Sequence, residues 1–288
     1  MKSSLSLLAA FVAVALFCGS CKPAAQNDPR HLTPLVSVQG SNTMTELLKA
    51  WADAFMKVHP DIPVSVTSDD SGNGIKALID QTTDMAAASR DLTSEEETLI
   101  QKKREHLRRI TVARDAIVIL VNPGNPVDAL TLDQLGDIFA GSKRNWHDFG
   151  GPNKPINIYT REKTSGTFDY FQQHILKTRQ YAKTALQVRS SNAITQAIHK
   201  EPWAIGYEGL GYAAEAGDKI KILKLKLADA SEAVAPSAAS TVDAYPLSRP
   251  LILFVDKGCK PSVTQFVDFI VSDKGQKIVG AAGYVPIK

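Results

Sequence analysis

Short apolar runs of β type alternate along the chain with segments whose apolar residues recur every three or four positions. In the first helical segment these positions are Met44, Leu47, Leu48, Trp51, Phe55 and Val58. The alternation predicts short strands over residues 36–38, 64–66 and 84–88, and helices from 43 to Pro60, over 74–79 and from 94. Because strands and helices alternate, the first third of the chain should form an α/β sheet with helices on its faces.

The rest of the chain continues this alternation. Strands are expected over 156–159, 203–207, 220–225 and 250–255, and helices over 131–139, 167–176, 192–199 and from 261. Capping boxes should start two helices, one at Ser94 with Glu97 and one at Thr131 with Gln134. Residues 228–240 read as a surface loop or a weak helix. Two extended segments, near 112–120 and 245–255, suggest two lobes between which the chain passes twice.

The first twenty residues have the pattern of a secretory signal peptide. Lys2 precedes an apolar run from Leu5 to Phe17, which is shorter than the roughly 20 residues that a membrane span needs. The following Gly-Ser-Cys resembles the end of a lipoprotein signal, although Cys18 stands where Leu is usual. We expect residues 1–20 to be removed, Cys21 to carry lipid and 21–34 to be a tether, so the protein should lie in the periplasm or cell envelope. The alternative is an exported protein that is cleaved nearby without lipid.

Composition narrows the possible partners. The chain has 288 residues and a formal net charge of +3, which is too balanced for nucleic acid or an anionic membrane as main partner. Its length favours two domains. If Cys21 is lipidated, Cys259 is left alone and no disulfide is expected. The six histidines lack the close spacing of metal ligands, so we expect no metal.

Three polar turns stand where a strand ends and a helix begins, at residues 40–43, 70–74 and 161–167. A helix start has unpaired N–H groups and the positive end of the helix dipole, so it favours anions. Arg161 adds a permanent charge that can bind two oxygens at once. The simpler interpretation is that Ser41, Ser71 and Ser165 only cap their own helices. Spacing alone does not show that the turns converge.

From residue 35 to 288 the chain resembles the phosphate-binding proteins of bacterial phosphate ABC transporters, which are of the periplasmic-binding-protein type. Residues 40–44, 71–75 and 88–90 (Ala-Ser-Arg) resemble motifs of that family's first lobe. The segment Arg161-Glu162-x-x-Ser165-Gly166-Thr167 resembles the anion loop of its second lobe and is the most specific match. Supporting stretches in the same order are 145–146, 150–151, 204–207, 245–251 and 282–286.

The resemblance implies a type II-like α/β fold of two lobes joined by a two-strand hinge, with residues 35–113 and 248–288 in lobe I and 114–247 in lobe II. Each lobe should have a central sheet flanked by helices. The residues that should bind phosphate are Ser41, Thr43, Met44, Ser71, Arg90, Arg161, Ser165, Gly166 and Thr167. The resemblance also implies a monomer that delivers phosphate to ABC transporter permease subunits and needs no cofactor.

Arg90 departs from the best-known form of the family, which has Asp after Ala-Ser. A carboxylate accepts the proton of monohydrogen phosphate but repels sulfate, so selectivity should depend on this position. Arg90 could instead add positive charge to the site or lock the lobe through a salt bridge. Asp70 and Asp91 are candidates for the missing acceptor. Sulfate, molybdate and tungstate therefore remain alternative ligands, with arsenate as a passive competitor. A role as an envelope phosphate sensor or scavenger also remains open.

An enzyme is the more distant alternative. Residues Gly72-x-Gly74-x-x-Ala77 loosely match a dinucleotide fingerprint, but such a lone match is weak. The sequence has no Gly-x-Ser-x-Gly elbow and no phosphate-binding Walker loop, so an exported hydrolase has little support. We expect a binding protein and no catalytic residues.

Overall fold

The computed structural model describes residues 35–103, 106–237 and 244–288. The predicted signal peptide, Cys21 and the tether lie outside the described residues, as do residues 238–240 of the predicted loop. No helix in the described part of the chain has the length and apolarity to cross a membrane.

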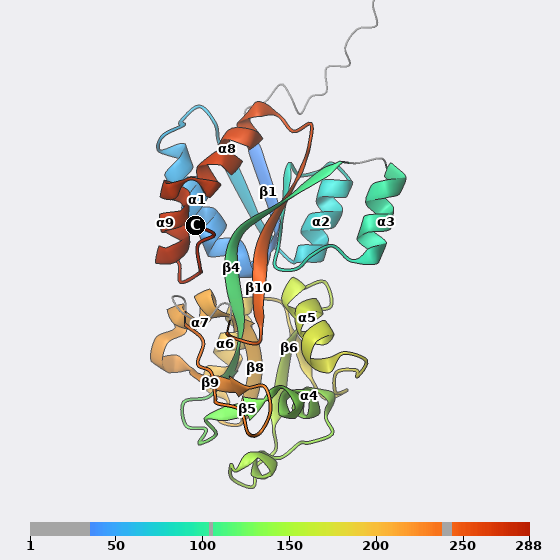
Figure 1. Ribbon diagram of the computed structural model, residues 1–288, viewed down its shortest axis with the longest axis vertical. Coiled ribbons are helices and arrows are strands. Elements are labelled where there is room, and N and C mark those ends of the chain that lie inside the picture. Colours follow the sequence, from blue (N-terminus) through green and yellow to red (C-terminus); the bar gives the residue numbers. More distant parts are fainter. Residues whose placement is uncertain (1–34, 104–105, 238–243) are drawn as a thin grey trace, which may run out of the picture. The chain divides into compact units, whose positions relative to one another are not determined.

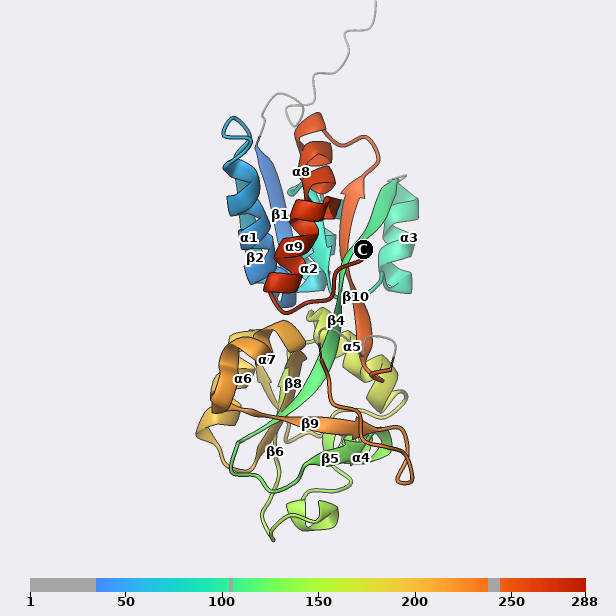
Figure 2. The ribbon, with the colours of Figure 1, turned by 60° about the vertical axis from the view of Figure 1, so that its left-hand side comes forward.

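Two long strands, β4 (Leu107–Val121) and β10 (Ser248–Asp256), connect two lobes. They pair antiparallel from Leu107 opposite Asp256 to Ala116 opposite Ser248. Beyond this point β4 continues into the second lobe, where Ile117 to Val121 pair with β8. Figures 1 and 2 show the green β4 and the orange β10 running side by side between the lobes. The two predicted extended segments and the two-lobed α/β fold are thereby confirmed.

The first lobe has the strand order β2-β1-β3-β10-β4, in which β1 is parallel to β2 and β3. Its other strands are β1 (Val36–Ser41), β2 (Val64–Asp69) and β3 (Met85–Ala88). Its helices are η2 (Asn42–Met44), α1 (Thr45–Met56), α2 (Ser71–Ile79), α3 (Ser94–Lys103), α8 (Pro261–Val271) and α9 (Asp273–Ala281).

The second lobe continues the order with β8, β6 and β7, while β9 pairs with β4 and β5. Its strands are β5 (Ala129–Thr131), β6 (Asn157–Arg161), β7 (Leu186–Val188), β8 (Ala204–Gly209) and β9 (Lys221–Lys226). Its helices are α4 (Leu132–Ala140), η3 (Trp146–Phe149), α5 (Gly166–Phe171), η4 (Gln172–Leu176), α6 (Ser191–Lys200), α7 (Leu210–Ala216) and η5 (Gly217–Lys219).

Apolar residues form cores in both lobes. In the first lobe there are two cores, one on each face of the sheet, because successive residues of a strand point to opposite faces. On β3, Met85 and Ala87 pack against α1, α8 and α9, whereas Ala86 and Ala88 face α2 and α3. The second lobe has one large cluster from Ala116 to Leu247. The predicted lobe boundaries at 113/114 and 247/248 stay a prediction.

Most of the predicted elements are present, with several differences. Helix α2 begins at Ser71 and not at Gly74, so most of the predicted turn at 70–74 is helical. The capping box of α3 uses Thr93 and Glu96 and not Ser94 and Glu97, because Glu96 N–H donates to Thr93 Oγ1 at 3.2 Å and Thr93 N–H to Glu96 Oε2 at 2.8 Å. The box at Thr131 is confirmed. The helix predicted over 167–176 changes to a π-helix from Gln172. Strands β5 and β7 and helix α7 were not predicted, since they are short.

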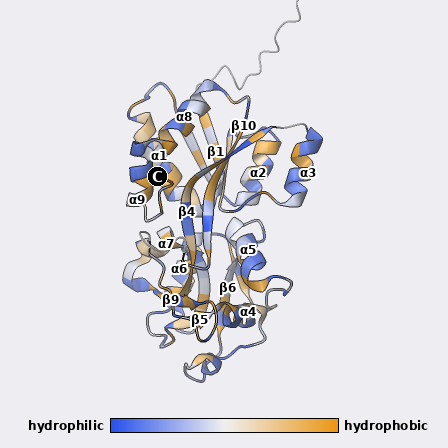
Figure 3. Ribbon diagram, in the orientation of Figure 1, coloured by the Kyte–Doolittle hydropathy of each residue, from blue (hydrophilic) through white to orange (hydrophobic). Residues whose placement is uncertain are grey.

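Hydrophilic residues interrupt the apolar interior at one level. Figure 3 shows blue positions on β4 and β10 between the lobes. In contrast, the part of β4 inside the second lobe (residues 117–121) and the part of β10 inside the first lobe (residues 251–255) are apolar. Asp115 of β4 and Arg249 of β10 lie there, both buried. A buried charge needs a partner, so this level must hold a polar network.

Gly40, near the end of β1, is predicted to contribute strongly to the stability of the first lobe. Its φ is +125°, and an added Cβ would lie 2.4 Å from the Ala87 carbonyl oxygen. Gly40→Ala should therefore lower the free energy of unfolding by about 3 kcal/mol, measured by denaturant titration. Gly150→Ala is the control, because Gly150 has φ +79° but no atom within 4 Å of the added Cβ, and it should cost about 1 kcal/mol. Equal losses would contradict the steric argument.

Candidate functional site

Two threonines from opposite lobes meet between them. Thr43, in the 3-10 turn after β1, and Thr167, in the first turn of α5, have hydroxyl oxygens 3.1 Å apart. Both residues are 1% exposed. The strand-to-helix turns predicted to converge therefore do so at these two residues.

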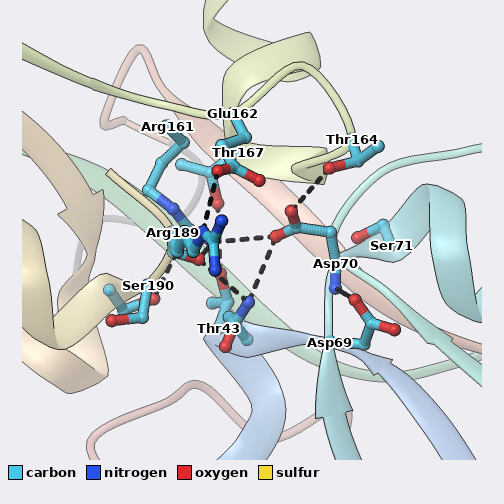
Figure 4. Close-up of polar contacts among 12 residues, drawn as sticks. Thr43, Asp69, Asp70, Ser71, Arg161, Glu162, Thr164, Thr167, Arg189 and Ser190 are labelled. Atoms are coloured by element: carbon cyan, nitrogen blue, oxygen red, sulfur yellow. Dashed lines mark hydrogen bonds and ion pairs between the residues drawn. The ribbon is translucent and has the colours of Figure 1, made fainter. Parts of the chain in front are cut away.

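Arg161, the last residue of β6, is fully buried and forms an ion pair with the opposite lobe. Its Nη2 lies 2.8 Å from Oδ1 of Asp70, the residue that precedes α2. The Thr164 hydroxyl donates to the other Asp70 oxygen at 2.7 Å. Figure 4 shows the Asp70 carboxylate between Arg161 and Thr164. One carboxylate of lobe I thus holds two residues of the loop from lobe II.

The second lobe supplies further partners to the same guanidinium. Arg161 Nη1 donates to the Ser191 hydroxyl at 3.2 Å and lies 3.5 Å from Glu208 Oε2. Its Nη2 also donates to the backbone carbonyl of Arg189 at 3.1 Å. Arg161 Nε is buried without a hydrogen-bond partner. Buried polar atoms of this kind call for an explanation, because nearly all of them are bonded.

Ser71 and Gly166 lie against each other across the lobe interface. A Cβ on Gly166 would lie 2.3 Å from Ser71 Oγ and 2.8 Å from Ser89 Oγ. Nearby, Gly72 N–H donates to the Thr164 carbonyl at 3.1 Å. One donor at the start of α2 is therefore used by the other lobe. Gly72 and Gly74 lie inside α2, after an acidic residue, which argues against the dinucleotide interpretation.

The three serines do not cap their own helices. Neither Ser41, at the N-cap of the 3-10 turn, nor Ser165, at the N-cap of α5, makes a side-chain cap bond. Ser71 is the first residue of α2, and its hydroxyl accepts from Ser89 N–H at 3.2 Å. Ser41 Oγ is buried without a partner. The simpler capping interpretation is therefore wrong for these side chains.

Arg90 forms an ion-pair cluster across the lobes. Its Nη1 and Nη2 bind Glu96 at 2.8 and 2.9 Å, and its Nε lies 2.7 Å from Asp169 Oδ2 of α5. Burial opposes the charge of Arg90, but Glu96 and Asp169 raise its pKa above the ordinary value. Burial raises the pKa of Asp169, and Arg90 opposes this. Two carboxylates thus occupy the Arg90 guanidinium, so its predicted role as an anion ligand has no support from these contacts.

Asp91 and Asp70, the two candidate acceptors, differ in placement. The Asp91 side chain is 60% exposed and is paired with Arg109. Asp70 is 5% exposed and lies at the lobe interface. Only Asp70 is therefore positioned beside the converging turns.

Arg249 and Asp115 complete the site, although neither is among the residues predicted from the sequence to bind the anion. Arg249 Nη1 donates to Thr167 Oγ1 at 2.9 Å, and Nη2 to Thr43 Oγ1 at 3.3 Å. Asp115 Oδ2 accepts from Nε and Nη2 at 3.0 and 2.8 Å. Burial raises the pKa of Asp115, and Arg249 opposes this. The run 245–251 had been noted only as a supporting motif, and no helical or strand pattern distinguishes a buried arginine within it.

Met44 and two tyrosines fix the backbone around Thr43. The Met44 side chain lies in the core of lobe I, so only its backbone can face a ligand. Tyr284 OH donates to the Thr43 carbonyl at 2.6 Å, and Tyr212 OH to the Asn42 carbonyl at 2.8 Å. Burial raises the pKa of Tyr284, so its hydroxyl stays a donor at neutral pH.

A polar cavity of about 600 Å³ opens beside this cluster, between α1 of lobe I and α6 and α7 of lobe II. Among its lining residues are Asn42, Ser68, Ser191 and Tyr212. Asn42 donates to Asp70 and Ser191 binds Arg161, so the cavity adjoins the buried network. Within the described ranges, no group of three or more His, Cys, Asp or Glu residues could hold a metal ion.

The fold and the site define a two-lobed binding protein whose lobes meet around a small, polar, buried cluster. The sequence matches the PBP superfamily domain over residues 23–274. The chain belongs to this superfamily.

Relatives and solved structures show which members of the superfamily the chain is similar to. The phosphate-binding protein PstS of Staphylococcus saprophyticus is 29% identical, over 96% of this chain and 88% of its own. PstS of Pseudomonas aeruginosa is 27% identical, over 98% and 94%. A substrate-binding protein from Clostridium perfringens, solved with bound phosphate, has a TM-score of 0.80 and 28% identity over 88% of this chain and 100% of its own. The resemblance stated from the motifs is thereby confirmed.

Gly166 is predicted to control how closely the lobes approach. In Gly166→Ala the new methyl group would clash with Ser71 Oγ and lie 3.0 Å from Ser71 Cβ, so the lobes must separate. The affinity for phosphate should fall by about tenfold or more, measured by calorimetry. Gly150→Ala, in the same lobe but in open space, should leave the affinity unchanged. Full affinity in Gly166→Ala would contradict the close approach.

Proposed function

We propose that this protein captures inorganic phosphate between its two lobes and delivers it to the permease of an ABC transporter. The observation that carries the proposal is that two buried contacts cross the same lobe interface, Thr43 with Thr167 and Arg161 with Asp70, as Figure 4 shows in one view. These residues come from segments far apart in sequence, and hydroxyl and guanidinium groups are good donors to an oxyanion.

The available hydrogen bonds are sufficient for tight binding. Micromolar affinity requires about 8 kcal/mol, and a hydrogen bond to a charged group contributes about 1.5–3 kcal/mol. The hydroxyls of Thr43 and Thr167, Arg161 and the backbone N–H groups at residues 44, 166 and 167 would together exceed this. The surplus offsets the cost of desolvating the anion and of bringing the lobes together.

Ser41 and Ser165 would add hydroxyl donors to the same anion. Ser41 Oγ is buried without a partner, and Ser165 is 2% exposed at the start of α5. Ser71 would donate from lobe I, the lobe of Ser41. A ligand with several acceptor oxygens would satisfy these groups, as buried polar atoms require.

Asp70 is the proposed basis of selectivity for phosphate over sulfate. Its two oxygens already accept from Asn42, Thr164 and Arg161. An ionised carboxylate has about four acceptor positions, so one more donor can be bound. Monohydrogen phosphate offers such a donor, whereas sulfate has none and would only be repelled. The neighbouring C. perfringens protein binds phosphate, which supports this choice over molybdate and tungstate.

Transport is the proposed physiological role. A relative of 28% identity from Vibrio cholerae, with a TM-score of 0.69 over 87% of this chain and 99% of its own, is an ABC-type phosphate transport receptor. An exported, lipid-anchored monomer that releases phosphate to a permease agrees with the predicted signal peptide and Cys21. Binding without turnover is proposed, so no residue is assigned a catalytic role.

Loss of Arg161 is predicted to weaken phosphate binding strongly. Arg161→Ala leaves Asp70 and Glu208 without their cation in a buried site, and the affinity for phosphate should fall at least about tenfold. Titration calorimetry measures this directly. Arg179→Ala is the control, because Arg179 forms a half-exposed ion pair with Asp137 in the same lobe, and its affinity should match that of the wild type. Equal affinities in all three proteins would contradict the proposal.

Replacing Asp70 should change the preference between anions. Asp70→Asn removes the negative charge that disfavours sulfate. The dissociation constant for phosphate divided by that for sulfate should therefore rise about tenfold. Competition titrations with both anions give the ratio. Asp91→Asn serves as control and should not alter it, since Asp91 is exposed and bound to Arg109. A shift in Asp91→Asn but not in Asp70→Asn would reverse the assignment.

A further inference from the structure

Arg249 is a buried arginine at the lobe interface, as are Arg90 and Arg161, and it lies outside the three strand-to-helix turns. It lies on β10, the strand that leads from the second lobe into the first, and its side chain is 0% exposed. Its guanidinium reaches one threonine of each lobe. We propose that Arg249 is a positioning residue that turns the hydroxyl hydrogens of Thr43 and Thr167 toward the bound anion. This inference rests on the proposed function.

The direction of the hydrogen bonds carries the argument. A guanidinium has only donors, so the oxygens of Thr43 and Thr167 must accept from Arg249. Each hydroxyl then keeps its single hydrogen for another acceptor. In the structure, one of these hydroxyls donates to the other across 3.1 Å. An oxyanion between the lobes would receive both hydrogens, and accepting from a cation makes each hydroxyl a stronger donor.

The fork shape of arginine allows one side chain to serve both lobes. Nη1 binds Thr167 and Nη2 binds Thr43, at 2.9 and 3.3 Å, from a single rigid plane. A lysine has one nitrogen at this point and cannot hold two oxygens in the same fixed arrangement. Arg249 can therefore bind both hydroxyls at once only when the two lobes are in contact.

Asp115 holds the fork in place. Its Oδ2 accepts from Nε and Nη2, and its Oδ1 accepts from Leu210 N–H at 3.0 Å. Both side chains of the pair are 0% exposed. The carboxylate also balances the charge of Arg249, so that the arginine acts on the anion through the threonines. In this role Arg249 differs from Arg161, which has a buried Nε without a partner.

Two other roles for Arg249 make different predictions. If the ion pair only holds the strands together, its loss should change stability and not the coupling to the threonines. If Arg249 attracts the anion directly by its charge, a lysine should replace it. A double-mutant cycle with a lysine variant separates these roles.

The test compares phosphate affinity of the full chain by calorimetry in two backgrounds, wild type and Thr167→Val. In each background the changes are Arg249→Lys and the pair Arg249→Met with Asp115→Asn, which leaves no unpaired buried charge. We expect either change to weaken phosphate binding at least about tenfold in the wild-type background. When Thr167 is Val, the same change should cause a loss of affinity that is smaller by a factor of at least about three. Arg179→Met, remote from the interface, is the matched control and should have no effect in either background.

Full affinity in Arg249→Lys, or the same loss in both backgrounds, would overturn the inference. If the Met–Asn pair does not fold, as judged by circular dichroism, the lysine cycle alone decides, because lysine keeps the ion pair with Asp115. A wild-type protein that binds no phosphate at millimolar concentration would instead overturn the proposed function, and the inference with it. Phosphate binding by the wild type with additive effects would remove only the role of Arg249.

Discussion

The contact between Arg161 and Asp70 is the interaction on which the arrangement of the two lobes depends. Both side chains are buried, and neither lobe alone supplies the pair. An unpaired buried charge is costly, so the guanidinium of one lobe requires the carboxylate of the other. The same contact brings Thr164 to Asp70 and the Thr164 carbonyl to α2. The anion loop is thereby held against the first lobe.

Net charge does not explain how such a site would attract an anion. Two arginines, Arg161 and Arg249, lie among three buried carboxylates, Asp70, Asp115 and Glu208. The attraction must therefore come from local donors: hydroxyl hydrogens, one guanidinium edge and backbone N–H groups at the helix starts. Donors in fixed positions also discriminate between ligands by shape and protonation, which diffuse charge does not. The attraction of the site for an anion therefore does not depend on the net charge of the chain, which is nearly balanced.

Local sequence patterns predicted the helices and strands better than they predicted the side-chain contacts. Periodicity located β4 and β10 and most of the helices, because the cores of both lobes repeat at strand and helix spacing. The α3 capping box was shifted by one residue because Thr93 and Ser94 are both suitable caps. Arg90 was predicted either to bind the anion or to lock the lobe through a salt bridge, and its contacts with Glu96 and Asp169 agree with the second interpretation. Spacing does not reveal that Asp169 lies in the other lobe. Arg249 was missed for the same reason, since its partners Thr43, Asp115 and Thr167 are distant in sequence.

The proposed function requires that both lobes bind one anion at the Thr43–Thr167 contact. A crystal structure of the full chain grown with phosphate would show whether they do. We expect one phosphate between the two threonine hydroxyls, within hydrogen-bond distance of Arg161, with the Arg249–Asp115 pair in place behind them. Phosphate bound only in the cavity beside α6 and α7, with the two threonine hydroxyls still bonded to each other, would contradict it.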